Sequence, residues 1–222
     1  MDYETLRPLL LWPHGLLGGG VLLSGAAAIA TKKGSPTHVK AGKVFFWAML
    51  AALAVALPLM ILSRNVFLLG LTPLTAYLVI AGRRTVQRRK QGLKVLAPVD
   101  RWLAIGTAAT CAGLVALGVK GWLGGSDFGV VAVALGMVGV LKAGGDWKNR
   151  DVLPDRATKY IEEHIGYMMA AFIAATTAFS AVNLGRVQAL PTWLVWLWPT
   201  VLGTVAIVVF TRRITKRGKK RR

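Results

Sequence analysis

Residues 44–62 read VFFWAMLAALAVALPLMIL, an apolar run without a charged side chain. Lys40 and Lys43 precede this run, and the polar triplet Ser63-Arg64-Asn65 follows it. A helix of about 20 residues crosses the roughly 30 Å hydrocarbon layer of a bilayer. Inside lipid every backbone polar group needs a partner within the protein, and a helix supplies these partners along its own length. The run therefore predicts a membrane-spanning helix.

Six further runs of the same character occur along the chain. Of the 222 residues, 55% are hydrophobic and only 17% are charged, and the mean hydropathy is +0.53. This composition predicts an all-α fold, a polytopic transmembrane bundle of about seven helices in one domain, residues 1–211, with a basic tail at 212–222. The other expected helices cover residues 9–30, 66–81, 102–119, 128–141, 165–182 and 191–210.

The positive charge predicts how this bundle is oriented. The net charge is +19, and the basic residues are concentrated in every other segment between the apolar runs. Lysine and arginine accumulate in cytoplasmic loops, so we expect the N-terminus outside and the C-terminus in the cytoplasm. An even number of helices would place the first basic loop or the basic tail on the wrong side. The only basic residues in the expected outer segments are Arg7, Arg64, Lys120 and Arg186.

The same charges predict the partners of the protein. Basic loops and a basic tail beside membrane helices are typical of contact with anionic lipid headgroups, in addition to the bilayer itself. No folded or aromatic-bearing recognition module accompanies the tail, so we do not expect nucleic-acid binding.

Three histidines are the candidates for chemistry. His38 lies in the first inner loop, and His164 opens the sixth run from the same side, directly after Glu163. Tyr160, Glu163, His164 and Tyr167 share one helix face by three-and-four spacing. If that face meets His38, two imidazoles and the Glu163 carboxylate could hold zinc or iron. The two histidines could instead ligate haem, or relay protons.

A purely structural interpretation competes with each of these sites. His164 could pair with nearby charges and fix the loop. His14 lies at the outer end of the first run, roughly 25–30 Å from the inner pair, so a three-histidine centre is not expected. For His14 we expect a hydrogen bond to backbone or to a lipid headgroup.

Two segments resemble a known family. Residues 32–49, KKGSPTHVKAGKVFFWAM, are similar to the signature loop of a family of bacterial predicted multi-pass membrane proteins, domain of unknown function 2306. An early histidine such as His14 and the run HIGYMM at 164–169, continuing to Thr177-Ala178-Phe179 and Asn183, match the same pattern. The resemblance implies a bacterial membrane protein with histidines at these three positions, and no established activity.

The sequence thus predicts a bacterial inner-membrane protein with a metal or haem site at its cytoplasmic side, formed by His38, His164 and Glu163. This site would serve redox or proton chemistry. The alternative is a non-catalytic scaffold, assembly factor or subunit of a larger membrane complex. A transporter is less well supported, because paired broken helices and charges buried in mid-helix are not apparent.

Overall fold

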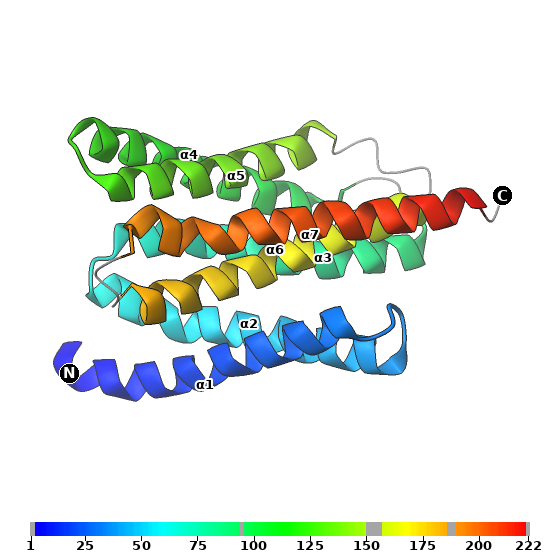
Figure 1. Cartoon of the computed structure of the whole chain (residues 1–222), viewed down its shortest axis with the longest axis horizontal. Helices are drawn as coiled ribbons and strands as arrows, with labels where there is room; N and C mark the ends of the chain where they lie inside the picture. Colours follow the sequence, from blue (N-terminus) through cyan, green and yellow to red (C-terminus); the bar gives the residue numbers. More distant parts are fainter. Residues whose placement is uncertain (1–2, 94–95, 150–156, 186–189, 221–222) are drawn as a thin grey trace. The chain divides into compact units, whose positions relative to one another are not determined.

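The computed structural model is entirely helical over the residues that it describes, 3–93, 96–149, 157–185 and 190–220 (Figure 1). Seven α-helices follow one another within these residues: α1 (Tyr3–Ala30), α2 (Pro36–Leu62), α3 (Val66–Gln91), α4 (Pro98–Leu123), α5 (Asp127–Lys148), α6 (Ala157–Leu184) and α7 (Thr192–Lys220). Each is long and apolar enough to cross a membrane, so the expected number of membrane helices is confirmed for the described part of the chain. Which terminus faces the cytoplasm stays a prediction.

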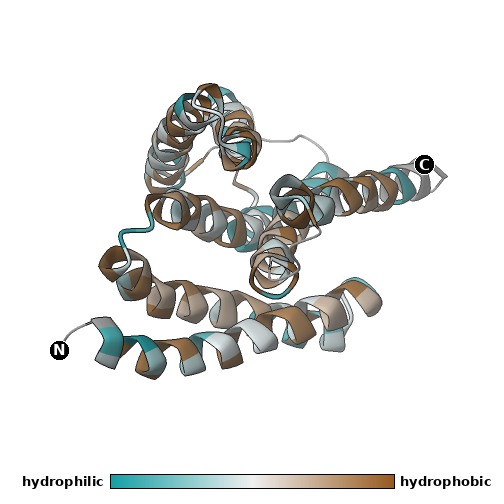
Figure 2. Ribbon diagram, turned by 60° about the vertical axis from the view of Figure 1, so that its left-hand side comes forward, coloured by the Kyte–Doolittle hydropathy of each residue, from teal (hydrophilic) through white to brown (hydrophobic). Residues whose placement is uncertain are grey.

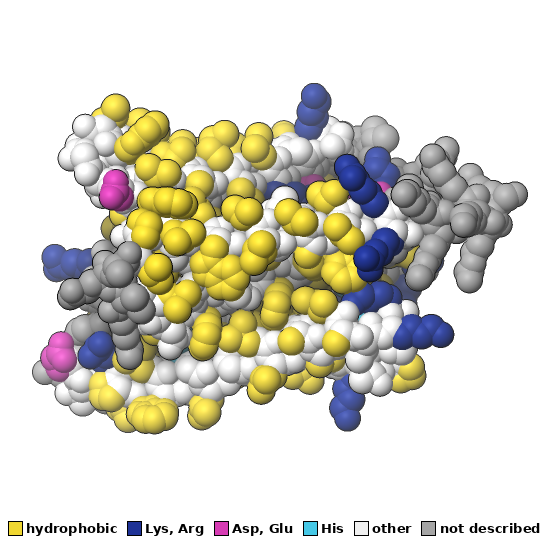
Figure 3. Space-filling model, viewed as in Figure 1, with side chains coloured by type: hydrophobic (Ala, Val, Ile, Leu, Met, Phe, Trp, Pro, Cys, Tyr) yellow, Lys and Arg dark blue, Asp and Glu magenta, His cyan; other side chains and the backbone are white. Residues whose placement is uncertain are grey.

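The helix surfaces are those of a protein surrounded by lipid. At most 33% of the residues in the apolar window of any helix are buried inside the protein. Large hydrophobic side chains such as Leu23, Leu123 and Val201 are well exposed. Figure 2 shows hydrophobic residues along the helices, and Figure 3 shows hydrophobic side chains over much of the visible face. Contiguous apolar surface on this scale is typical of a membrane-facing protein.

The chain divides into two compact units, residues 1–72 and 73–222, and the boundary falls inside α3. In the first unit α1 and α2 pack as a hairpin. The helix α2 begins at Pro36 because Ser35 caps it: the backbone N–H of His38 donates to Ser35 Oγ at 3.2 Å, and proline occupies the first turn. That residues 1–211 form one transmembrane domain stays a prediction.

A tight turn joins α2 to α3 at the triplet Ser63-Arg64-Asn65, the polar residues that follow the apolar run 44–62. Arg64 takes a positive φ of 52°, and the Asn65 side chain accepts the backbone N–H of Leu68 at 3.0 Å. These two features reverse the chain within three residues and start the next helix.

In the second unit, glycines bring α4 and α5 into backbone contact. A Cβ added at Gly136 would lie 2.9 Å from the carbonyl oxygen of Cys111, and one at Gly118 would lie 2.7 Å from the amide nitrogen of Val133. Small residues permit this approach, which supplies the van der Waals contact that associates helices in lipid.

The helices α6 and α7 are joined through Ser180, which donates to Val195 O at 2.8 Å and accepts from Trp198 Nε1 at 2.7 Å.

Several helices are longer than the apolar runs that predicted them. The helix α3 continues to Gln91 rather than ending at residue 81, and α5 continues to Lys148 rather than 141. The helices α4 and α6 begin at Pro98 and Ala157, before the expected 102 and 165. Residues 143–148, expected in a loop, are therefore helical. The side chains of the basic tail from residue 214 onward lie outside the described residues.

Candidate functional site

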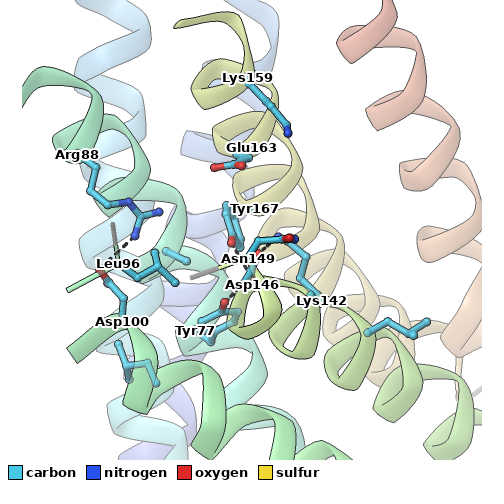
Figure 4. Close-up of a pocket in the computed structure, with 14 residues that line it drawn as sticks. Tyr77, Arg88, Leu96, Asp100, Lys142, Asp146, Asn149, Lys159, Glu163 and Tyr167 are labelled. Carbon is cyan, nitrogen blue, oxygen red and sulfur yellow. Dashed lines mark hydrogen bonds and ion pairs between the residues drawn. The ribbon is translucent and has the colours of Figure 1, made fainter. Parts of the chain in front are cut away.

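The second unit contains a cavity of about 360 Å³ between α3, α4, α5 and α6 (Figure 4). Ionisable and aromatic side chains from all four helices line it. Its buried wall includes Tyr77 and Tyr167, whereas Leu141, Asn149 and Lys159 are exposed and form its mouth. The remaining lining residues are Ala81, Arg88, Leu96, Asp100, Leu103, Lys142, Gly145, Asp146 and Glu163.

Asp146 is the centre of the first polar cluster in the wall. Its Oδ2 accepts the hydroxyl of Tyr77 from α3 and the hydroxyl of Tyr167 from α6, the latter at 2.6 Å. Its Oδ1 accepts the ammonium group of Lys142, one helical turn earlier in α5, at 2.8 Å. Lys142 Nζ also lies 3.9 Å from the centroid of the Tyr167 ring. Three donors thus compensate the negative charge of this carboxylate. They are needed because burying a charge away from water is costly unless it is paired and hydrogen-bonded.

Asp100, in the first turn of α4, is the centre of the second cluster. It accepts two hydrogen bonds from Arg84 of α3, through Nε and, at 3.2 Å, through a terminal nitrogen. Arg88 adds a third at 3.1 Å and also donates to Thr85 Oγ1 at 3.0 Å. The side chains of Arg88 and Asp100 are only 6% and 7% exposed. This buried ion pair fixes the C-terminal part of α3 against the start of α4.

Glu163 and Lys159 belong to neither cluster, although Glu163 interacts electrostatically with Lys142 and with Lys159. They project from α6 beside the cavity, and Asn149, the residue that follows α5, lies near them (Figure 4). No hydrogen bond or ion pair within 4 Å joins either charge to another residue in the described part of the chain. They are therefore the charged groups of the cavity that remain available to a bound molecule.

Each histidine, in contrast, connects two helices through a backbone carbonyl. His14 Nδ1 of α1 lies 3.0 Å from Ala52 O of α2. His38 Nδ1 of α2 lies 2.9 Å from Ala28 O at the end of α1, and His164 Nδ1 of α6 lies 2.8 Å from Gly82 O of α3. A carbonyl oxygen only accepts, so the protonated nitrogen in each case is Nδ1.

These positions give no support to the predicted metal or haem centre. Within the described ranges, no group of three or more His, Cys, Asp or Glu side chains is arranged to hold a metal ion. His38 belongs to the first compact unit and His164 to the second. Glu163 lines the cavity, and His164 does not. The set His38, His164 and Glu163 remains an untested hypothesis.

The predicted face of α6 divides into two parts. Glu163 and Tyr167 reach the cavity, whereas His164 reaches α3 and the Tyr160 hydroxyl donates to Leu93 O at 3.0 Å. Sequence reasoning missed Tyr77, Arg88, Asp100, Lys142 and Asp146. The available signal was the presence of aspartates among the many basic residues at the predicted cytoplasmic ends.

Comparisons with protein-family models, with curated proteins and with solved structures found no match. The resemblance to domain of unknown function 2306 therefore stays a prediction, and the function has to be argued from the site.

Proposed function

We propose that this chain is a multi-pass protein of the bacterial inner membrane that binds a small polar solute in the cavity of its second unit. The N-terminus lies outside and the C-terminus in the cytoplasm, so the cavity, formed by the basic helix ends, faces the cytoplasm. Anionic lipid headgroups contact the basic segments around it.

The observation that carries this proposal is the charged lining of the cavity. Six charged side chains from four apolar helices line a volume of about 360 Å³, within the range of small-molecule sites. Ionisable groups placed between membrane helices are costly and usually mark a ligand or ion site. Packing alone would be achieved at lower cost by apolar side chains of similar volume.

The test is a thermal-unfolding screen of the detergent-purified protein against polar solutes. A solute at about 100 times its Kd should stabilise the folded protein by roughly 2.7 kcal/mol. Asp146→Asn should abolish the shift, because it disturbs the wall of the cavity. Asp127→Asn is the matched control: the same substitution in α5, at a residue that does not line the cavity.

If no solute stabilises the wild type, the proposal fails and the scaffold or subunit function becomes the leading one. A solute that stabilises Asp146→Asn as strongly as the wild type would bind elsewhere, which also contradicts the proposal.

The metal or haem hypothesis is tested separately. Histidines that bind metal through Nε2 commonly donate Nδ1–H to a carbonyl, and His38 and His164 both do so. Elemental analysis for iron, zinc and copper should compare the wild type with the His38→Ala, His164→Ala double variant. Near-stoichiometric metal that is lost in the variant would establish this site; metal-free wild type, purified without chelators, would exclude it.

A further inference from the structure

The charges that line the cavity balance in number. Arg88, Lys142 and Lys159 are cationic, and Asp100, Asp146 and Glu163 are anionic. Lys142 pairs with Asp146, and Arg88 pairs with Asp100. Arg84 also pairs with Asp100, but it lies outside the lining. Among the described residues this leaves one lining charge of each sign without an ion pair within 4 Å, Glu163 and Lys159, and these two attract each other at longer range.

These two groups lie one helical turn apart on the same helix. Four residues separate them on α6, and Figure 4 shows Lys159 nearer the start of that helix and Glu163 one turn deeper. Residues at this spacing lie about 5–6 Å apart at Cβ. Two opposite charges one turn apart on one helix match the two charges of a small zwitterion in number and sign, and the amide of Asn149, the residue that follows α5, adds a donor and an acceptor.

We propose that the ligand is a zwitterion that carries an ammonium group and an acidic group. The ammonium donates to the Glu163 carboxylate, and the acidic group accepts from Lys159 and Asn149. The inference rests on the proposed solute-binding function and specifies its ligand class. A single ion would leave an uncompensated charge in a partly desolvated cavity, whereas a zwitterion leaves the balance of the lining unchanged.

The same chemistry occurs in two kinds of molecule: free zwitterions such as amino acids, and the headgroup of an aminophospholipid. Leu141, at the mouth, is 68% exposed and presents apolar surface beside the charged groups. A lipid could place its acyl chain there, and a free zwitterion would not need this surface. The experiment therefore requires one arm for each source.

In the first arm, calorimetric titration of the detergent-purified full chain uses glycerophosphoethanolamine and L-alanine, with methylamine and acetate as single-charge controls. In the second arm, the shift in unfolding temperature is measured with phosphatidylethanolamine and with phosphatidylglycerol, whose headgroup lacks an amine. We expect at least one zwitterion, free or lipid-borne, to bind at least tenfold more tightly than its single-charge comparison.

Glu163→Gln should weaken that binding at least tenfold, because the amide removes the negative charge that holds the ammonium. Glu162→Gln, the neighbouring substitution on α6 outside the cavity lining, should leave it unchanged. Lys159→Gln, with Lys148→Gln as its control, tests the other end of the ligand should Glu163→Gln fail to fold.

Each outcome is decisive. If methylamine or acetate binds as tightly as the zwitterion, the proposal of a zwitterionic ligand is wrong. The same holds if binding is unchanged in both Glu163→Gln and Lys159→Gln. Neither result contradicts the proposed solute-binding function. Absence of binding by any solute would remove the proposed function as well.

Discussion

The hydroxyl of Tyr167 donates to Oδ2 of Asp146 at 2.6 Å, and the same oxygen accepts the hydroxyl of Tyr77. One carboxylate on α5 therefore receives donors from α3 and from α6. The tyrosine rings meet edge to face, with centroids 6.1 Å apart. This convergence connects three helices at the buried wall of the cavity.

Tyr167→Phe keeps the ring and removes the donor to a charged acceptor, so we expect unfolding free energy to fall by about 1.5–3 kcal/mol. Tyr160→Phe removes a hydrogen bond to a neutral carbonyl, and about 0.5–1.5 kcal/mol should be lost. Chemical unfolding in detergent, followed by tryptophan fluorescence, measures both. A loss in Tyr160→Phe that equals or exceeds the loss in Tyr167→Phe would contradict the importance assigned to Asp146.

Asp100→Leu should destabilise the protein by about 3–5 kcal/mol, because it leaves the buried Arg88 guanidinium without its carboxylate. In the double variant Asp100→Leu, Arg88→Met, both buried charges are gone, and most of the loss should be recovered. The comparison is a double-mutant cycle measured by the same unfolding assay. If the loss of unfolding free energy in the double variant equals the sum of the losses in the two single variants, the two residues do not interact as described.

Gly136→Ala should cost about 1–3 kcal/mol, because the new methyl group would meet the backbone of α4. Gly144→Ala is the control in the same helix: nothing lies within 4 Å of its added Cβ, and alanine favours the helix by up to about 1 kcal/mol. Unfolding curves of the two variants should therefore move in opposite directions. Equal destabilisation would mean that glycine at 136 is not required for the packing of α4 on α5.

The orientation can be tested by cysteine labelling, since Cys111, the single cysteine, is buried. In a Cys111→Ser background, Ser126→Cys lies between α4 and α5, and Lys32→Cys lies between α1 and α2. A membrane-impermeant maleimide should label position 126 in intact cells and position 32 only after permeabilisation. The opposite pattern would reverse the predicted topology.

Hydropathy predicted the helices but not where they end. An apolar run stops at the first charged residues, so the expected third helix stopped before Arg83 and Arg84 and the fifth before Lys142. The helices continue because Asp100 and Asp146 compensate these cations from neighbouring helices or from one turn away. Compensation between different helices depends on tertiary structure and leaves no periodic pattern in the sequence.

The candidate site was predictable to a similar degree. Spacing alone placed Glu163 and Tyr167 on one helix face, and both line the cavity. Tyr77 lies 69 residues from Asp146 and gave no local signal for their contact. Histidine is the commonest metal ligand, which made the three histidines the predicted site, whereas their rings contact backbone carbonyls.

The three histidine bridges have a consequence for how these helix pairs respond to substitution. In each bridge Nδ1–H donates to a backbone carbonyl oxygen of another helix, that of Ala52, Ala28 or Gly82. The acceptors belong to the main chain, so a change of side chain at the acceptor position leaves the carbonyl oxygen in place. Each bridge therefore depends on the identity of one side chain alone, the histidine.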